Sequence, residues 1–180
     1  MSYHIFETVS HAPNMNRLLF ILCFIPLLFA SCSKEDNDVS VVGTWKLTAW
    51  NITDGFDINK DGTVSTNILD EVVCENNETL IFETNGVISS SETYNPEIDI
   101  ALLDGTTDEY TYMVTCDEQG VIGFATTYSQ ATDKVVFNDV EFTVGDKELF
   151  RVKKEAIKIY NETFTEVIAT KDLTMVYTKQ

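Results

Sequence analysis

The sequence predicts an all-β domain, folded as an antiparallel barrel or sandwich. Short stretches in which apolar and polar residues alternate recur along the chain, and turns rich in Gly, Asn and Asp separate them. No long segment carries the 3.6-residue apolar period of a helix. The 180-residue chain has room for one such domain with a core of its own, behind a distinct N-terminal segment.

That N-terminal segment has the features of a secretory signal peptide. Arg17 precedes an apolar run, Leu18–Phe29, and two small residues follow the run. The run is only about a dozen residues long, whereas crossing a bilayer takes roughly 20, so a permanent transmembrane helix is the weaker interpretation. Residues 1–14 are polar and acidic where a basic region is expected, which favours Met15 as the start. We expect residues 1–31 to be removed as a signal peptide.

The junction Leu28-Phe29-Ala30-Ser31-Cys32 resembles the lipobox of bacterial lipoproteins, although Phe29 stands where Leu is usual. The resemblance implies cleavage before Cys32 and attachment of acyl chains such as palmitate. Several chains are needed, because a single one anchors a protein only marginally. The expected location is the cell envelope, with the protein held at the outer membrane by lipid.

Residues 32–40 are expected to be a lipidated acidic tether. Ser33-Lys34-Glu35-Asp36-Asn37-Asp38 contains no apolar residue to bury. Its acids resemble the tag that directs some lipoproteins to the cell surface, and a plain solvated spacer fits equally well. Surface exposure is therefore one of two open alternatives.

The strands predicted in the domain, residues 41–180, follow from alternation and from Val, Ile, Thr and aromatic content. Asn85-Gly86 between two of them is the strongest hairpin signal, and Lys171-Asp172 is expected to be a turn. Lys153–Ala156 could also turn helical. The predicted strands are Val42–Trp50, Glu78–Glu83, Gly86–Ser90, Glu109–Thr115, Val121–Thr127, Lys134–Val144, Glu148–Ile159, Thr163–Thr170 and Leu173–Thr178.

The order of motifs resembles the bacterial lipocalin-like lipoproteins. Gly43-Thr44-Trp45 opens the first strand, Cys74 precedes Glu78–Phe82 and the Asn85-Gly86 turn, and Leu173–Thr178 ends the chain. The resemblance covers most of residues 41–180 and is weakest over Tyr94–Asp108. It implies an up-and-down antiparallel β-barrel with Trp45 packed at its closed end. An indole there can plug the barrel while its N–H finds a carbonyl.

Cys74 and Cys116 are the two cysteines left once the signal peptide and the lipidated Cys32 are set aside. Export places them in an oxidising compartment, which favours a disulfide. Two buried free thiols are the alternative, and the spacing does not decide between them.

An acidic loop after the first strand carries calcium-loop spacing. Asp57, Asn59 and Asp61 stand at positions 1, 3 and 5 of a DxNxDG pattern, and Gly62 supplies the turn. Thr63 could add a carbonyl, and Ser65 could hold a bridging water. Asp70 or Glu71 could close the shell only if the loop takes a different path. Ile68 occupies position 12, where an EF-hand needs a carboxylate, so the loop is no EF-hand. A calcium site and a plain acidic turn both remain open.

Charge and composition exclude some functions. The net charge of −17 argues against nucleic acid as a partner and suits either a soluble head or one that collects cations. Both histidines, His4 and His11, lie ahead of Met15, which leaves no Ser-His or Cys-His pair. Paired carboxylates of a glycosidase would arise by chance among so many acids. We expect no enzyme activity.

The sequence thus predicts a monomeric, membrane-anchored lipoprotein, and the resemblance to lipocalin-like lipoproteins implies that its barrel binds a small apolar ligand. The alternative is a structural or adhesion module with a solid barrel, whose loops bind protein or glycan. The many aromatic residues fit core packing first and a stacking platform for sugar second. An open apolar cavity would favour the first function, and a filled interior would favour the second.

Overall fold

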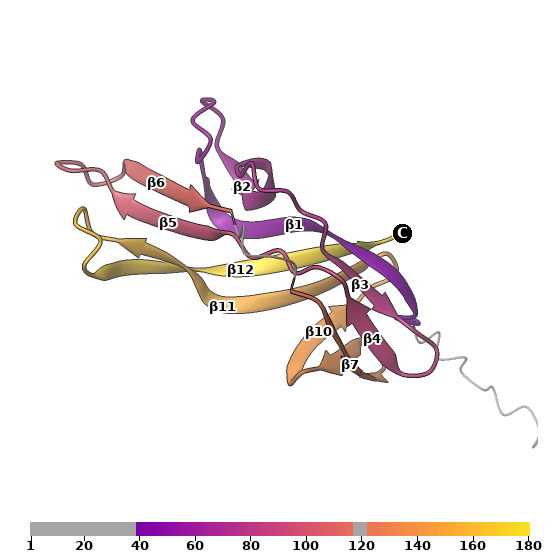
Figure 1. Cartoon of the computed structure of the whole chain (residues 1–180). Coiled ribbons are helices and arrows are strands. Elements are labelled where there is room, and N and C mark those ends of the chain that lie inside the picture. The colour runs from indigo at the N-terminus through magenta and orange to yellow at the C-terminus, as the bar shows by residue number, and fades with distance from the viewer. Residues whose placement is uncertain (1–38, 117–121) are drawn as a thin grey trace, which may run out of the picture. The chain divides into compact units, whose positions relative to one another are not determined.

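The computed structural model describes residues 39–116 and 122–180. These residues form one β-rich unit, which contains a single turn of 3-10 helix, η2 (Ile68–Asp70), and no α-helix in the described ranges (Figure 1). The strands are β1 (Gly43–Phe56), β2 (Ser65–Asn67), β3 (Thr79–Phe82), β4 (Val87–Ser90), β5 (Glu97–Leu102), β6 (Tyr110–Thr115), β7 (Phe124–Thr127), β8 (Ser129–Ala131), β9 (Lys134–Phe137), β10 (Val140–Val144), β11 (Glu148–Tyr160) and β12 (Val167–Lys179).

The strands pair as an up-and-down barrel that is nearly closed. The pairing order is β7-β4-β3-β1-β12-β11-β10-β9-β8, and every neighbour on this path is antiparallel. Tyr128 alone separates β7, which pairs with β4, from β8, which pairs with β9. One bent strand therefore bridges the two ends of the path. The predicted all-β barrel is confirmed.

Three long strands carry the sheet beyond the barrel. β1, β11 and β12 are each 13 or 14 residues long, and their outer ends support β2 and the β5–β6 hairpin. β5 pairs with β11 in parallel, at Ile159–Ile100 and Tyr160–Ala101. We call β3, β4 and β7–β10 with the inner ends of the long strands the barrel half. The outer ends with β2, η2, β5 and β6 are the extension half, which lies at the opposite end in Figure 1.

Several predicted boundaries are wrong. Lys134–Val144 is a hairpin of β9 and β10, with Asn138 and Asp139 in left-handed conformations at its turn. The expected turn at Lys171-Asp172 lies inside β12, which runs unbroken through it. β11 is strand throughout, and the stretch considered for helix forms a bulge between Lys153 and Ile157. β2, β5 and β8 were not predicted.

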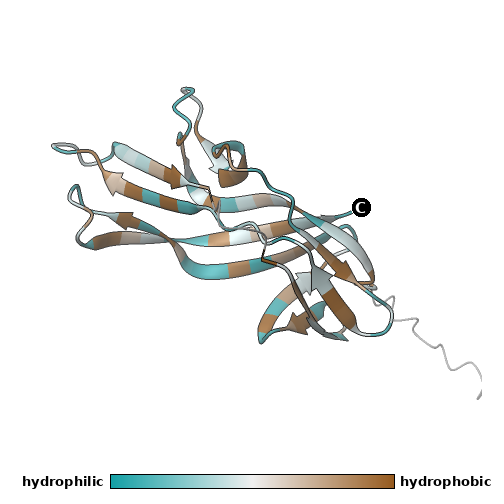
Figure 2. Cartoon of the chain, viewed as in Figure 1, coloured by the Kyte–Doolittle hydropathy of each residue, from teal (hydrophilic) through white to brown (hydrophobic). Residues whose placement is uncertain are grey.

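The core runs through both halves. Alternate residues point inward along the strands, as in β3, where Leu80 and Phe82 are buried and Ile81 is not. Apolar and polar bands therefore alternate along the strands in Figure 2, while the loop at the top and the hairpin turns are mostly hydrophilic. The predicted hairpin at Asn85-Gly86 is confirmed: it joins β3 to β4, and Gly86 has a φ of 83°.

Candidate functional site

Aromatic rings pack against one another in the core of the barrel half. Phe137 stacks on Phe142 with ring centroids 4.8 Å apart, and on Phe124 at 6.0 Å. Phe82 approaches Phe137 edge-on at 5.9 Å, and Tyr177 approaches Phe142 at 6.0 Å. These contacts form a continuous aromatic column.

Trp45 is buried in the core, and its indole N–H finds a carbonyl, as predicted. Its indole is fully buried and its Nε1 donates to the carbonyl of Val41 over 2.7 Å. Gln130 holds the incoming chain: its Oε1 accepts from the Val41 amide over 3.0 Å, and its Nε2 donates to the Val39 carbonyl over 2.6 Å. The first described residues are therefore fixed to the barrel half.

A buried glutamate joins the two halves. One carboxylate oxygen of Glu78 accepts from the Tyr177 hydroxyl over 2.5 Å, and the other accepts from the Tyr94 amide over 2.7 Å. Burial raises the pKa of Glu78 above its ordinary value, and the two hydrogen bonds oppose that rise. Burial also raises the pKa of Tyr177 and brings that of Tyr94 to about 12. Glu78 thereby ties the β4–β5 connection to β3 and β12.

Two polar atoms near this junction have no hydrogen-bond partner among the described residues. They are Nε1 of Trp50 and the hydroxyl of Tyr94, on rings packed edge-on with centroids 4.9 Å apart. Both side chains are buried.

A groove of about 370 Å³ lies at the far end of the extension half, and we call it the distal groove. Its two sides come from the end of β1 with the following loop and from β6 with the preceding turn. Phe56 forms the floor, with ring centroids 5.4 Å from Tyr110 and 5.8 Å from Tyr112. The groove is lined by Gly55, Phe56, Asp57, Lys60, Val64, Asp108, Glu109, Tyr110 and Tyr112.

The electrostatics of the distal groove are dominated by carboxylates. Asp57, Asp108 and Glu109 face a single ammonium group, that of Lys60. Burial raises the pKa of Tyr112, and the nearby charge of Asp57 raises it further. Lys171 lies below the groove, with its Nζ 5.5 Å from the centre of the Phe56 ring. The opening thus offers hydrogen-bond acceptors, phenolic rings and net negative charge.

The structure brings three of the five predicted calcium ligands together beside this groove. Asp57 accepts from the amides of Asp61 and Gly62 over 3.0 Å each, and Asn59 accepts from the Asp61 amide over 2.9 Å. Asp61 in turn accepts from the amide of Thr63 over 2.7 Å, so the Thr63 amide is engaged within the loop. Asp70 reaches the loop only through the Ser65 hydroxyl, 3.4 Å away. Among the described residues, no group of three or more His, Cys, Asp or Glu side chains is placed to hold a metal.

Glu71, one of the two acids considered for the calcium shell, binds amides of this loop, and its burial was not predicted. Its carboxylate is buried and accepts from the amides of Ile58 over 2.9 Å and Asn59 over 3.3 Å. The signal available was an acid directly after η2, which is too common to indicate a buried one. Protein groups therefore contribute to the shape of the loop.

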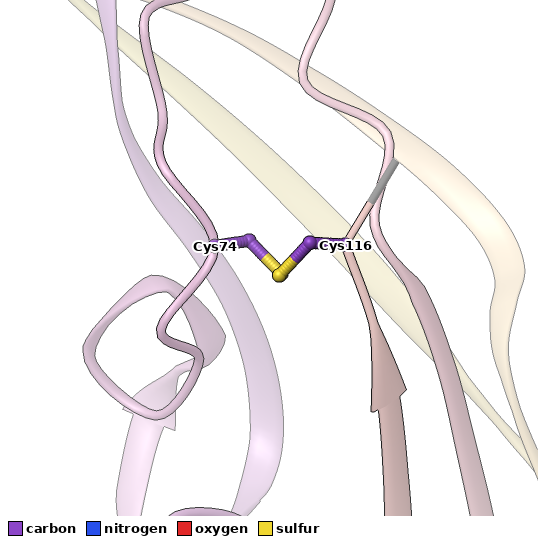
Figure 3. The surroundings of a disulfide bond; sticks show 2 residues. All are labelled: Cys74 and Cys116. Carbon is purple, nitrogen blue, oxygen red and sulfur yellow. A yellow bond between two sulfur atoms is a disulfide. The ribbon is translucent and has the colours of Figure 1, made fainter. Parts of the chain in front are cut away.

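The predicted disulfide between Cys74 and Cys116 is confirmed. It joins the segment after η2 to the end of β6, with the two Cα atoms 5.3 Å apart (Figure 3). Within the described residues β6 has backbone pairing only with β5. The disulfide therefore holds the free side of the β5–β6 hairpin against the β2–β3 connection.

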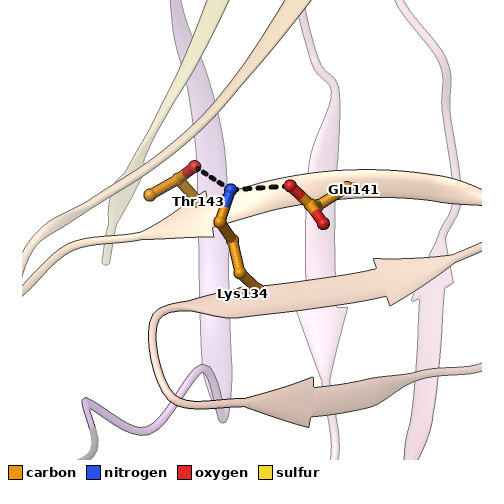
Figure 4. Close-up of polar contacts among 3 residues, drawn as sticks. All are labelled: Lys134, Glu141 and Thr143. Atoms are coloured by element: carbon orange, nitrogen blue, oxygen red, sulfur yellow. Dashed lines mark hydrogen bonds and ion pairs between the residues drawn. The ribbon is translucent and has the colours of Figure 1, made fainter.

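A second groove, of about 460 Å³, runs over the outside of β9, β10 and β11. Lys134 crosses it and donates to Glu141 over 2.6 Å and to Thr143 over 3.4 Å (Figure 4). The bond to Glu141 raises the pKa of Lys134. Arg151 and Asp139 also line this groove, so its positive and negative side chains balance, whereas acids outnumber lysine in the distal groove.

Cys32, the signal peptide and the tether up to Asp38 lie outside the described residues. In the two described ranges no helix is long and apolar enough to span a membrane. The chain matches no protein-family model, and no curated protein or solved structure is significantly similar to it. The resemblance to lipocalin-like lipoproteins thus rests on its motifs and stays a prediction.

Proposed function

We propose that this protein is an envelope lipoprotein, anchored through Cys32, that docks an external partner at its distal groove without catalysing a reaction. The observation that carries the proposal is the contrast between the two halves. The core of the barrel half holds the aromatic column from Phe124 to Tyr177, whereas the extension half has an open groove lined by three acids and one lysine. Of the two functions that the sequence left open, the solid docking module fits this contrast better.

The position of the tether supports docking at the far end. Val39 and Val41 are bound to Gln130 in the barrel half. Residues 32–38 can span at most roughly 25 Å when extended, so a lipid at Cys32 would keep the barrel half close to the membrane. A 14-residue strand such as β1 is about 45 Å long, which would carry the distal groove away from the lipid surface.

A small apolar ligand inside the barrel is the competing function, and the barrel fold itself is compatible with it. The test is a titration of the purified protein with a fluorescent fatty acid, in parallel with Phe137→Ala, which removes the central ring of the column. We expect no saturable binding to the wild type and measurable binding to the variant. One-to-one binding to the wild type would overturn the solid-barrel proposal and restore the apolar ligand.

The lipid anchor has its own test. Cells fed with labelled palmitate should label the wild type and the Cys23→Ala control, whose substitution lies inside the signal peptide. Cys32→Ala should carry no label and should leave the membrane fraction. Label on the Cys32→Ala protein would contradict anchoring at that residue.

A further inference from the structure

The outer edge of β6 is an unused row of main-chain groups. Within residues 39–116 and 122–180, β6 pairs with β5 on one side and has no backbone ladder on the other. An exposed edge of this kind is a template for an added strand. Natural proteins usually cover such an edge or place charge on it, and here it borders the distal groove.

The register shows which residues present this row. The Leu103 amide donates to the Glu109 carbonyl over 2.8 Å, which makes Leu103 and Glu109 a hydrogen-bonded pair. Bonded and non-bonded pairs alternate along an antiparallel ladder. Tyr112, which pairs with Ile100, lies three residues after Glu109. It therefore forms a pair without hydrogen bonds to β5, and so do Tyr110 and Val114. The N–H and C=O groups of these three residues therefore point away from β5.

The side chains of the same residues meet the groove. Tyr110 and Tyr112 line it and pack against Phe56, which is buried. Met113 points to the other face of β6 and is exposed. A strand laid along this edge would alternate in the same way, with one set of side chains over the Phe56 floor and the other beside Met113.

The charge around the edge selects the occupant. Asp57, Asp108 and Glu109 outnumber Lys60, and the whole chain carries a net charge of −17. A second copy of this chain would bring the same negative charge and be repelled. A glycan could use the tyrosine rings and the carboxylates but would leave the main-chain row unused. A basic, extended peptide can form hydrogen bonds with the main-chain groups of β6 and also neutralise the negative charge of the acids.

We propose that the distal groove binds an extended basic segment of a partner protein, which adds to the sheet as a strand along the open edge of β6. This inference rests on the proposed docking function and specifies its partner. Main-chain hydrogen bonds to Tyr110, Tyr112 and Val114 supply the affinity, and the acidic rim selects lysine- or arginine-rich segments.

The probe is a capped hexapeptide of alternating lysine and valine, added to the full-length protein in detergent. Hydrogen exchange resolved to single amides is the readout. In the free protein we expect fast exchange at Tyr110, Tyr112 and Val114 and slow exchange at the intervening residues of β6. The peptide should slow exchange at those three amides. A glutamate–valine peptide tests the charge, and a lysine–valine peptide with N-methylated amides tests the main-chain bonds.

The binding variant is Asp108→Lys with Glu109→Lys, and its control is Glu162→Lys with Glu166→Lys on the β11–β12 turn, where both acids are exposed and the charge change is equal. We expect the dissociation constant to rise about tenfold or more for the first variant and for the N-methylated peptide, and to stay unchanged for the control.

The other outcomes overturn the inference. The first is that the amides of β6 gain no protection at peptide concentrations up to about 1 mM, where specific docking would be detected. The second is that the N-methylated peptide binds as tightly as the unmodified one, which would mean that charge attraction alone causes the binding. Protection that grows with protein concentration would make a second copy the occupant, and protection by a neutral oligosaccharide instead of the peptide would make it a glycan. If the peptide fails while Cys32 labels and the barrel stays closed to fatty acid, strand addition is wrong and the docking lipoprotein stands.

Discussion

The barrel half and the extension half share β1, β11 and β12 but close their sheets by different interactions. In the barrel half, backbone ladders run almost all the way round, and aromatic rings pack against one another in the core. In the extension half the sheet runs β2-β1-β12-β11-β5-β6, and β6 has no ladder across to β2. The Cys74–Cys116 disulfide and the contacts of Phe56 with Tyr110 and Tyr112 bridge that gap. The extension half, in which β6 has no backbone ladder on its outer side among the described residues, is thus also the half that contains the disulfide.

The largest expected effect is on the aromatic column. Phe137→Ala removes a buried ring that touches Phe82, Phe124 and Phe142, and should lower the free energy of unfolding by about 3–5 kcal/mol. The matched control is Phe164→Ala on the β11–β12 turn, where the ring is 42% exposed, and it should change stability by less than about 1 kcal/mol. Urea unfolding measures both. Equal losses in the two variants would show that the column does not dominate stability.

The second prediction separates the halves. Cys74→Ser with Cys116→Ser opens a loop with a sequence separation of 42, which should cost about 2–4 kcal/mol. We expect hydrogen exchange to accelerate in β5 and β6 while β9 and β10 stay protected, because only the extension half depends on the bond. Uniform acceleration over all strands would mean that the two halves unfold as one unit.

The third prediction concerns the junction between the halves. The folded pKa of Glu78 lies above the ordinary 4.5, so the folded protein holds this proton more tightly than the unfolded chain. The stability that Glu78 contributes is thus complete below pH 4.5 and is lost as the pH rises through the folded pKa. Glu78→Gln stays uncharged and should reduce the fall in unfolding free energy above pH 4.5 by an amount on the order of 1 kcal/mol.

Denaturant unfolding across that pH range is the measurement for Glu78, with Glu97→Gln as the control because Glu97 is exposed on β5. The control should follow the wild-type curve. A Glu78→Gln curve that also follows the wild type would show that Glu78 titrates no differently in the folded and unfolded states.

The smallest expected effect is that of calcium on the loop beside the distal groove. Without a carboxylate at Ile68, affinity should fall in the range of roughly 10⁻⁴–10⁻³ M, and millimolar calcium should stabilise the fold by about 1 kcal/mol at most. Melting curves with chelator and with calcium measure it in the wild type and in Asp57→Ala with Asp61→Ala. Asp104→Ala with Asp146→Ala removes the same charge elsewhere. If calcium shifts the melting temperature equally in all three proteins, its effect is general charge screening and not binding to this loop.

The sequence predicted the barrel half better than the extension half, for physical reasons. Strands joined by short turns, such as β3 and β4 at Asn85-Gly86, can be predicted from the residues of the turn itself. β5 was missed because Glu97 and Asp99 are disfavoured in strands and its parallel partner β11 is far away in the sequence. The false turn at Asp172 has a similar cause: its carboxylate binds Lys154 over 2.7 Å and the Glu155 amide over 3.0 Å across the β11 bulge.

The same distinction holds for the candidate site. The disulfide and the acidic loop were predictable because cysteine number and DxNxDG spacing are local signals. The distal groove was not, since it requires Phe56 to meet Tyr110 and Tyr112 through tertiary packing. The hydrogen bond of the Trp45 indole could be predicted because it depends on one nearby carbonyl, that of Val41.

The long pairing of β1 with β12 has a mechanical consequence. The two strands run antiparallel in register from Trp45–Lys179 to Asn51–Thr174, with one irregularity on the way. If the proposed anchor and the proposed docking partner pull against each other, the force acts along the direction of these strands, and the part of it that passes from β1 to β12 loads their hydrogen bonds in parallel. Bonds loaded in shear must break together, whereas a hairpin pulled at its open end unzips one bond at a time. The hydrogen bonds of the β1–β12 ladder, which spans both halves, would then resist the force together.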